Sequence, residues 1–246
     1  MKIIGSYVSP YVRKVLACMA LKGLSYEIDP ITAFYGGDEF ERLSPLRRIP
    51  VLVEEDFALT DSSAICAYLD EKWPEPPLLP TDLRDRARAR WFEEYADTRL
   101  GDVFIWGLFY QQYVRPIVFG EDGDAARVEK TLAEDLPREL DYLEGQLPEE
   151  GFLFGEEIGL ADISIATFFR NAHYVGEGAD PERWPVTNAF VRRALAHRCF
   201  ASLYPFEKVQ MTTDPKGRRA ALVAAGAPLT PTTLGTREAR PGVMRL

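Results

Sequence analysis

The chain has 246 residues, enough for one large domain or for two small domains with buried cores. Hydrophobic residues make up 46% of it and charged residues 27%, a balance that excludes a disordered or fibrous protein. The net charge of −9 argues against a nucleic-acid-binding protein, because such a protein needs a basic face to replace the counterions of the phosphates.

Residues 2–7 are typical of a strand, so we expect no export signal at the start of the sequence. No stretch approaches the roughly 18 uninterrupted apolar residues of a membrane span, so we expect no membrane contact and a cytoplasmic protein. Cys18, Cys66 and Cys199 lie far apart and outside any Cys-x-x-Cys or Cys/His cluster. We therefore expect three buried thiols, and neither a disulfide framework nor a metal site.

The first 74 residues alternate between strand and helix signals. Ser9 and Pro10 begin a helix, because serine is a favoured N-cap and proline is favoured at the first helical position. Asp61 and Ser62 begin another helix, which runs to Trp73. Strands are expected at residues 2–7, 26–29, 49–54 and 56–60. This order of strands and helices predicts a thioredoxin-like α/β domain.

Residues 75–82 are rich in proline and are typical of a linker. Beyond them strand signals vanish, and apolar residues recur at intervals of three and four, which predicts an all-α domain. Helices are expected at residues 87–113, 128–147, 160–174 and 186–197. From residue 212 the periodicity fails. We expect a thioredoxin-like domain at residues 1–74, the linker at 75–82, an all-α domain at 83–206 and a C-terminal extension at 207–246.

Three short segments, in this order along the chain, carry a specific family signal. Ser9-Pro10-Tyr11-Val12 follows a strand and begins a helix, and it looks like the CPYC redox motif of glutaredoxins with both thiols replaced. Ile49-Pro50-Val51 looks like the cis-proline turn of thioredoxin-like domains. The segment from Thr60 to Ile65 is similar to an E-S-x-A-I element, with aspartate in place of glutamate. Together with the change from α/β to all-helical sequence, these segments resemble the glutathione S-transferase family over residues 1–206.

A fourth segment, Gly159-Leu160-Ala161-Asp162, resembles the helix-capping box of the same family, with glycine where serine or threonine is usual. Glycine at an N-cap costs only a few tenths of a kcal/mol relative to serine, so the helix is still expected to form.

The resemblance implies that glutathione is the cofactor and that Ser9 donates a hydrogen bond to its thiolate. Ser6, at the end of the first strand, is the alternative, because other classes of the family place their catalytic tyrosine there. With no cysteine in the motif, dithiol–disulfide exchange is disfavoured. A serine that only caps the helix is the competing interpretation for Ser9.

The resemblance also implies how the rest of glutathione is held. The backbone of Ile49 beside Pro50 is expected to pair with the cysteinyl backbone like an added strand. The amino end of the second helix, with Asp61 and Ser62, is expected to bind the γ-glutamyl group. Arg48 is the candidate for the glycyl carboxylate, although a solvated pair of arginines at this point of the chain is an equally good interpretation.

Four aromatic residues are candidates for a pocket that binds the second substrate: Tyr11, Trp106, Tyr110 and Tyr113. Their competing interpretation is ordinary helix core. The resemblance places the helix that carries three of them opposite the glutathione thiol.

These expectations lead to a homodimeric glutathione transferase that activates the thiolate for attack on a hydrophobic small-molecule electrophile. Glutathione-dependent isomerisation, dehalogenation and ether cleavage are alternatives, because they use the same thiolate on other acceptors. A binding or regulatory protein without catalytic activity is the alternative of another class.

Overall fold

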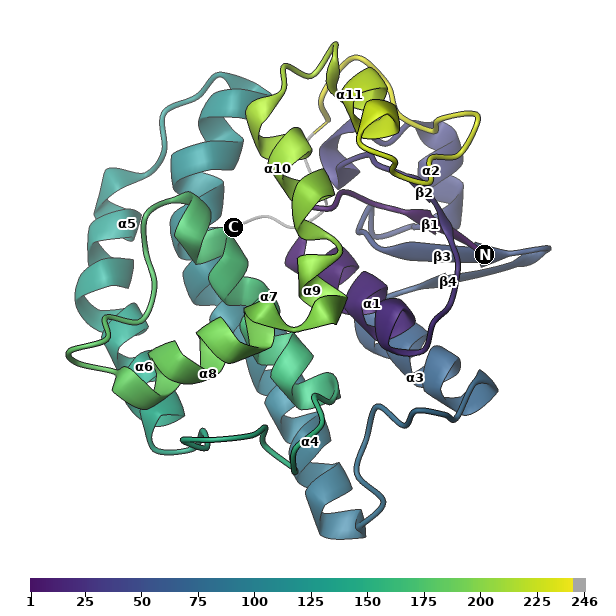
Figure 1. The fold of residues 1–246 in the computed structure, drawn as a ribbon. Helices are drawn as coiled ribbons and strands as arrows, with labels where there is room; N and C mark the ends of the chain where they lie inside the picture. The colour runs from purple at the N-terminus through teal and green to yellow at the C-terminus, as the bar shows by residue number, and fades with distance from the viewer. Residues whose placement is uncertain (241–246) are drawn as a thin grey trace. The chain divides into compact units, whose positions relative to one another are not determined.

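The computed structural model describes residues 1–240. The described residues form two compact units (Figure 1): the first contains Met1–Pro76 and residues 198–240, and the second contains Pro77–His197. The sequence expectation assigns residues 198–206 to the helical domain. In the structure they belong to the first unit, because α9 (Arg198–Ala201) packs against α1 (Pro10–Leu21).

The first unit is built on a sheet of four strands in the order β2-β1-β3-β4. These are β1 (Lys2–Ile4), β2 (Glu27–Asp29), β3 (Val51–Glu54) and β4 (Phe57–Thr60). β1 and β2 are parallel, with Ile3 opposite Ile28, whereas β3 is antiparallel to both β1 and β4. This mixed sheet confirms the thioredoxin-like α/β fold that was expected of the amino-terminal part of the chain.

The helices of the first unit come from both ends of the chain. Near the amino end are α1, the short η1 (Ala33–Tyr35), α2 (Asp38–Leu43) and α3 (Ser62–Lys72), and near the carboxyl end are α9, α10 (Tyr204–Thr212) and α11 (Arg218–Ala224). α1 packs against α3, and the Sγ atoms of the buried Cys18 and Cys66 on these two helices lie 3.7 Å apart. All three cysteines are free and buried, as expected.

The second unit contains only helices, which confirms the all-α expectation. α4 (Leu83–Tyr95) continues as η2 (Ala96–Phe119), a segment with π-helical hydrogen bonding. α5 (Ala125–Lys130), η3 (Thr131–Asp135) and α6 (Leu136–Glu144) follow one another without a break, and then come α7 (Leu160–Tyr174) and α8 (Pro185–Ala196). α7 is almost wholly buried, and it packs against α4, η2 and α8.

α7 begins as its sequence predicts. Gly159 is the N-cap, and the carboxylate of Asp162 accepts a hydrogen bond from the Gly159 N–H at 2.8 Å and another from the Leu153 N–H at 2.9 Å. The side chain that a serine or threonine would contribute at the cap is therefore missing, and the carboxylate supplies the reciprocal half of the capping box alone.

Residues 228–240, here called the C-terminal strap, follow the outer edge of β2 and the segment after it. The Ile28 N–H donates to the Pro228 carbonyl at 2.8 Å, and the Thr230 N–H donates to the Ile28 carbonyl at 3.0 Å. Further along, the Leu234 N–H donates to Asp29 Oδ2 at 2.7 Å. The part of the expected extension at residues 241–246 lies outside the described residues. Within residues 1–240, no helix is both long and apolar enough to cross a membrane.

Candidate functional site

Ser9 is the N-cap of α1. Its backbone is extended, with φ −70° and ψ 127°, and its Oγ accepts a hydrogen bond from the Val12 N–H at 3.4 Å. Pro10 occupies the first helical position, where it has no N–H to satisfy. Within residues 1–240, the hydroxyl proton of Ser9 has no acceptor. The half-buried Ser9 can therefore cap the helix and still donate a hydrogen bond to a ligand.

Ser6, the alternative serine, is in a different situation. It is 4% exposed, and its hydroxyl donates to Gln210 Oε1 at 3.0 Å while accepting from the Val8 N–H at 3.2 Å. Both the donor and an acceptor position of this hydroxyl are thus used inside the protein. The preceding Gly5 has a φ of 152°, and a Cβ there would lie 2.5 Å from Val12 Cγ2, so the chain can turn toward Ser6 only with glycine.

Two other residues near the start of α1 have structural roles. Tyr7 is 1% exposed, and its ring packs at a tilt against that of Phe206 with the centroids 5.1 Å apart. Burial raises the pKa of its phenol. The sequence favours a surface salt bridge for Arg13. Instead, Arg13 Nε lies 3.2 Å from Glu207 Oε2, and both side chains are fully buried. Glu207 lies on α10, nearly two hundred residues away in the sequence, so no local sequence pattern predicts this ion pair.

The bond between Ile49 and Pro50 is cis, as the sequence indicates. Within residues 1–240, neither the N–H nor the C=O of Ile49 has a hydrogen-bond partner. Both groups are thus available to an extended ligand backbone.

The two arginines before this bond differ. Arg47 is buried, and its guanidinium forms an ion pair with Glu41 at 2.9 Å and donates to the Gly36 carbonyl at 3.1 Å. It thus stabilises the segment that precedes it in the chain. Arg48 is exposed, and its side chain makes no hydrogen bond or ion pair with the described residues. Of the pair, only Arg48 presents a guanidinium to solvent.

Asp61 is the N-cap of α3, with an unusual positive φ of 76°. Its carboxylate accepts hydrogen bonds from the Ser63 N–H at 2.9 Å and the Ala64 N–H at 3.1 Å. The N–H of Ser62, at the first helical position, is left without a partner within residues 1–240. A non-glycine residue with positive φ is often found at a functional site, where the surrounding structure enforces it.

Sequence reasoning misses Lys14, which lies on α1 and is fully buried. Its Nζ donates to Ser63 Oγ at 3.1 Å and so ties α1 to the first turn of α3. The adjacent basic residues Arg13 and Lys14 in a helix that is otherwise mostly apolar are the signal that could have identified it, because a buried ammonium requires polar partners.

The aromatic candidates fall in different units. Tyr11 belongs to the first unit, while Trp106, Tyr110 and Tyr113 lie on η2 in the second. The rings of Trp106 and Tyr110 are 5.4 Å apart, and each of the three residues on η2 is half-buried. That these residues line one acceptor pocket with Tyr11 stays a prediction.

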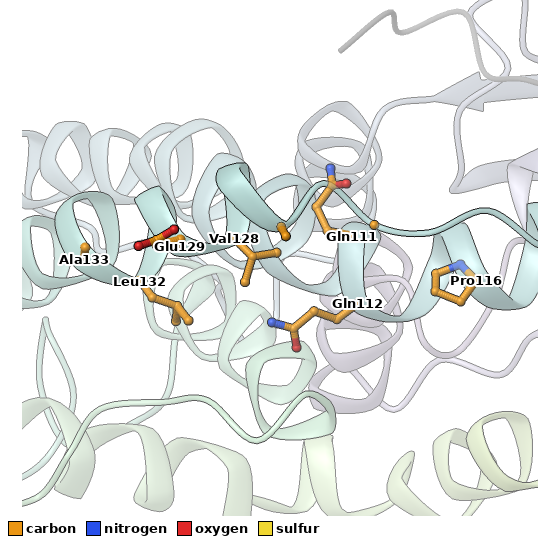
Figure 2. Close-up of a pocket in the computed structure, with 9 residues that line it drawn as sticks. Gln111, Gln112, Pro116, Val128, Glu129, Leu132 and Ala133 are labelled. Atoms are coloured by element: carbon orange, nitrogen blue, oxygen red, sulfur yellow. The ribbon is translucent and has the colours of Figure 1, made fainter.

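The second unit has an open pocket of about 800 Å³ between the end of η2 and the α5–η3 segment (Figure 2). Its lining includes Gln112 and Pro116 from one side and Val128, Glu129 and Leu132 from the other. None of the predicted acceptor residues lines it. Within residues 1–240, no three His, Cys, Asp or Glu side chains are grouped as a metal site would require.

The first unit is a thioredoxin-like domain whose candidate site consists of the amino ends of α1 and α3 and the cis bond before Pro50. The second unit is all-helical. The family models for the N-terminal and C-terminal domains of glutathione S-transferases match residues 3–77 and 89–193. The chain therefore belongs to the glutathione S-transferase family.

Among its relatives, glutathione S-transferase Z1 of Arabidopsis thaliana is 42% identical over 90 residues, which span 35% of this chain and 41% of that protein. Maleylacetoacetate isomerase of Pseudomonas aeruginosa is 29% identical over 214 residues, 83% of this chain and 96% of that protein. The crystal structure of a glutathione S-transferase from Rhodospirillum rubrum F11 superimposes on this structure with a TM-score of 0.77 at 24% sequence identity. The superposition covers 89% of this chain and 98% of that one, so the two proteins share a fold.

Proposed function

We propose that this protein is a glutathione transferase that binds glutathione in the first unit and activates its thiolate for attack on a hydrophobic electrophile. Ser9 is the donor to the thiolate in this proposal. We also propose that the protein acts in the cytoplasm as a homodimer and that Tyr11, Trp106, Tyr110 and Tyr113 contact the electrophile.

The observation that carries the proposal is the difference between the two serines. The hydroxyl proton of Ser6 is used by Gln210, whereas that of Ser9 has no acceptor within the described part of the chain. A thiolate needs a donor, so Ser9 fits the role and Ser6 does not.

The remaining groups fit the other parts of glutathione. Among residues 1–240 the N–H of Ser62 at the start of α3 has no partner, and it suits the γ-glutamyl carboxylate, since helix amino ends attract anions. The exposed carboxylate of Asp61 suits its ammonium group. The N–H and C=O of Ile49, which no described residue pairs with, suit the cysteinyl backbone. The exposed guanidinium of Arg48 suits the glycyl carboxylate.

The interactions at Ser9 are strong enough to ionise the thiol of bound glutathione at neutral pH in this proposal. A free thiol has a pKa of about 8.5 and is mostly protonated at neutral pH. Lowering that pKa by one to two units requires about 1.4 to 2.7 kcal/mol. A hydrogen bond from a hydroxyl to a charged group contributes about 1.5 to 3 kcal/mol, and the amino end of α1 adds about 0.3 to 1 kcal/mol. Ser9 therefore needs to act only as a donor, and no general base is required.

The test begins with titration calorimetry of the wild-type protein with glutathione, which should show binding at millimolar concentration or below. Replacing Ser9 by alanine should then raise the pKa of bound glutathione by about one to two units and lower kcat/KM about 10- to 100-fold, because the thiolate loses its donor. Conjugation to a chloronitroaromatic acceptor reports the rate, and the ultraviolet absorbance of the thiolate reports the pKa.

Two further variants separate chemistry from folding. Ser9→Gly loses the hydroxyl while keeping most of the capping stability, so it should show the same catalytic defect as Ser9→Ala. Ser25→Ala removes an exposed serine between α1 and β2 and should behave as wild type. A normal thiolate pKa in both Ser9 variants would show that Ser9 is not the donor.

Isomerisation is the second candidate, because the similarity to a maleylacetoacetate isomerase extends over 96% of that protein. The same thiolate would then add to the substrate and leave again, so the glutathione site is shared by both candidates. Parallel assays of isomerisation of maleylacetoacetate and of conjugation of a chloronitroaromatic compound distinguish them. Glutathione binding without turnover in either assay would favour a non-catalytic binding protein.

A further inference from the structure

The segment that leads to Ser9 is anchored by one face of α10. Phe206, Glu207 and Gln210 share this face, because positions three and four apart lie next to each other on a helix. Glu207 is 0% exposed and Gln210 is 3% exposed, so two polar side chains are buried here. Buried polar groups need partners, and these two find them in the segment before Ser9.

Gln210 connects that segment to a second one. Its Oε1 accepts the hydrogen bond from the Ser6 hydroxyl at 3.0 Å, and its Nε2 donates to the Pro30 carbonyl at 3.0 Å. The carbonyl of Ser6 in turn accepts a hydrogen bond from the Ser9 N–H at 3.0 Å. The backbone of Ser9 is therefore held by a residue that Gln210 holds.

Glu207 acts on the same segment through Arg13. The two charged side chains are 3.2 Å apart and fully buried, and Arg13 Nη2 donates to the Val8 carbonyl at 3.2 Å. Val8 directly precedes Ser9. An arginine without Glu207 would be a buried unpaired charge, and it would be expected to leave this position.

Tyr7, between Ser6 and Val8, packs on Phe206 of the same helix with ring centroids 5.1 Å apart. All three residues before Ser9 are thus held by α10, either directly or through Arg13. This segment and α10 lie near opposite ends of the sequence.

We propose that Gln210 and Glu207 are positioning residues, which hold the Ser6–Ser9 segment so that the Ser9 hydroxyl points at the sulfur of bound glutathione. This inference rests on the proposed function, since it assumes that Ser9 serves glutathione. Neither residue touches the substrate in this scheme; each acts through the backbone of the segment.

The physical reason is the steep dependence of a hydrogen bond on its geometry. The bond weakens strongly as its angle falls below about 120° or its length grows beyond the normal range. A displacement of the donor by about 1 Å can cost as much as 100-fold in rate. A residue that merely stabilises the fold would change the unfolding temperature, but it would not change the ionisation of a bound thiol.

The experiment replaces Gln210 by methionine, which keeps the length of the side chain and removes both hydrogen bonds, in the full-length protein. Lys208→Met is the matched control, since Lys208 is exposed on the same helix. kcat, the KM for glutathione and the pKa of bound glutathione are measured for each protein. We expect kcat to fall about 10-fold and the thiol pKa to rise by about one unit in Gln210→Met.

The KM for glutathione should stay within about twofold of wild type, because Arg48, Ile49 and Ser62 are unchanged. Gln210→Asn provides a second variant that stays polar and alters the volume little, but its amide is too short to reach both Ser6 and Pro30. It should show the same separation of kcat from KM.

Wild-type kcat and thiol pKa in the two Gln210 variants would overturn the inference, even if their unfolding temperatures fell. A rise in KM with unchanged kcat would overturn it as well. Failure of the proposed function is a separate result, seen when the wild-type protein itself takes up no glutathione in the calorimeter.

Discussion

The carboxyl group of Asp162 is 1% exposed at the start of α7. Burial raises the pKa of this carboxyl to about 6, although the hydrogen bonds from the N–H groups of Leu153 and Gly159 lower it. Asp162 therefore keeps its proton at a pH where an exposed aspartate has lost it. Its ionisation at higher pH lowers the stability of the folded state.

This shift has a definite consequence for stability. The folded pKa lies above the unfolded value of 3.8, so the folded state binds more protons between about pH 4 and pH 6. The stabilisation of the folded state by protonated Asp162 is fully present below pH 4 and is lost as the pH rises through 6. We expect the free energy of unfolding to lose on the order of 2–3 kcal/mol from this group across that interval.

Asp162→Asn removes the titration while keeping the shape of the side chain. Denaturant unfolding at pH 4, 5, 6 and 7 should show that the difference in stability between wild type and this variant changes over the interval. A difference that is independent of pH would mean that the carboxyl does not titrate there.

Among the elements, β2 is the strand most dependent on the carboxyl end of the chain. Its outer edge would otherwise present unpaired N–H and C=O groups, which invite pairing with other chains. The C-terminal strap satisfies these groups at Ile28, and its Leu234 packs beside the cluster of Ile4, Phe40 and Val51. Strap residues further along bind the segment that contains η1, where the Thr236 N–H donates to the Tyr35 carbonyl at 2.7 Å.

Deleting residues 228–246 should therefore expose the edge of β2. The amides of Ile28 and Gly37 lose their acceptors, so their hydrogen exchange should accelerate strongly, and the loss of stability should be on the order of 3 kcal/mol. Leu52, in the interior strand β3, is the internal control and should change only as much as global stability does. Unchanged protection of Ile28 would contradict the role given to the strap.

The elements that sequence predicts well are those with local signals. The first residues of α1, α3 and α7 follow from Ser9, Asp61 and Gly159, because capping depends on neighbours within four positions. α11 has no such signal: it is seven residues long and lies in a segment whose composition resembles a loop. A short helix of this kind is stabilised by packing on α10 rather than by its own propensity.

At the scale of the whole molecule, prediction fails wherever two distant parts of the chain meet. The site groups Ser9, Pro50 and Ser62 belong to motifs that can be recognised one at a time. The hydrogen bond from Ser6 to Gln210 joins residues 204 positions apart, and that from Leu234 to Asp29 joins residues 205 positions apart. Neither pair has a periodicity or a motif, so only the structure shows that the carboxyl end of the chain completes the first unit.

The division of the first unit has a consequence for the order of events during biosynthesis. The polypeptide leaves that unit at Pro76 and returns to it at Arg198. At roughly 5–20 residues per second, a ribosome needs about 6–24 s to make the intervening segment. Through that interval the nascent chain holds Arg13 without the carboxylate that neutralises it, whereas the helical unit is uninterrupted and can close its core first. The first unit can therefore complete its fold only after the segment from Arg198 has been made.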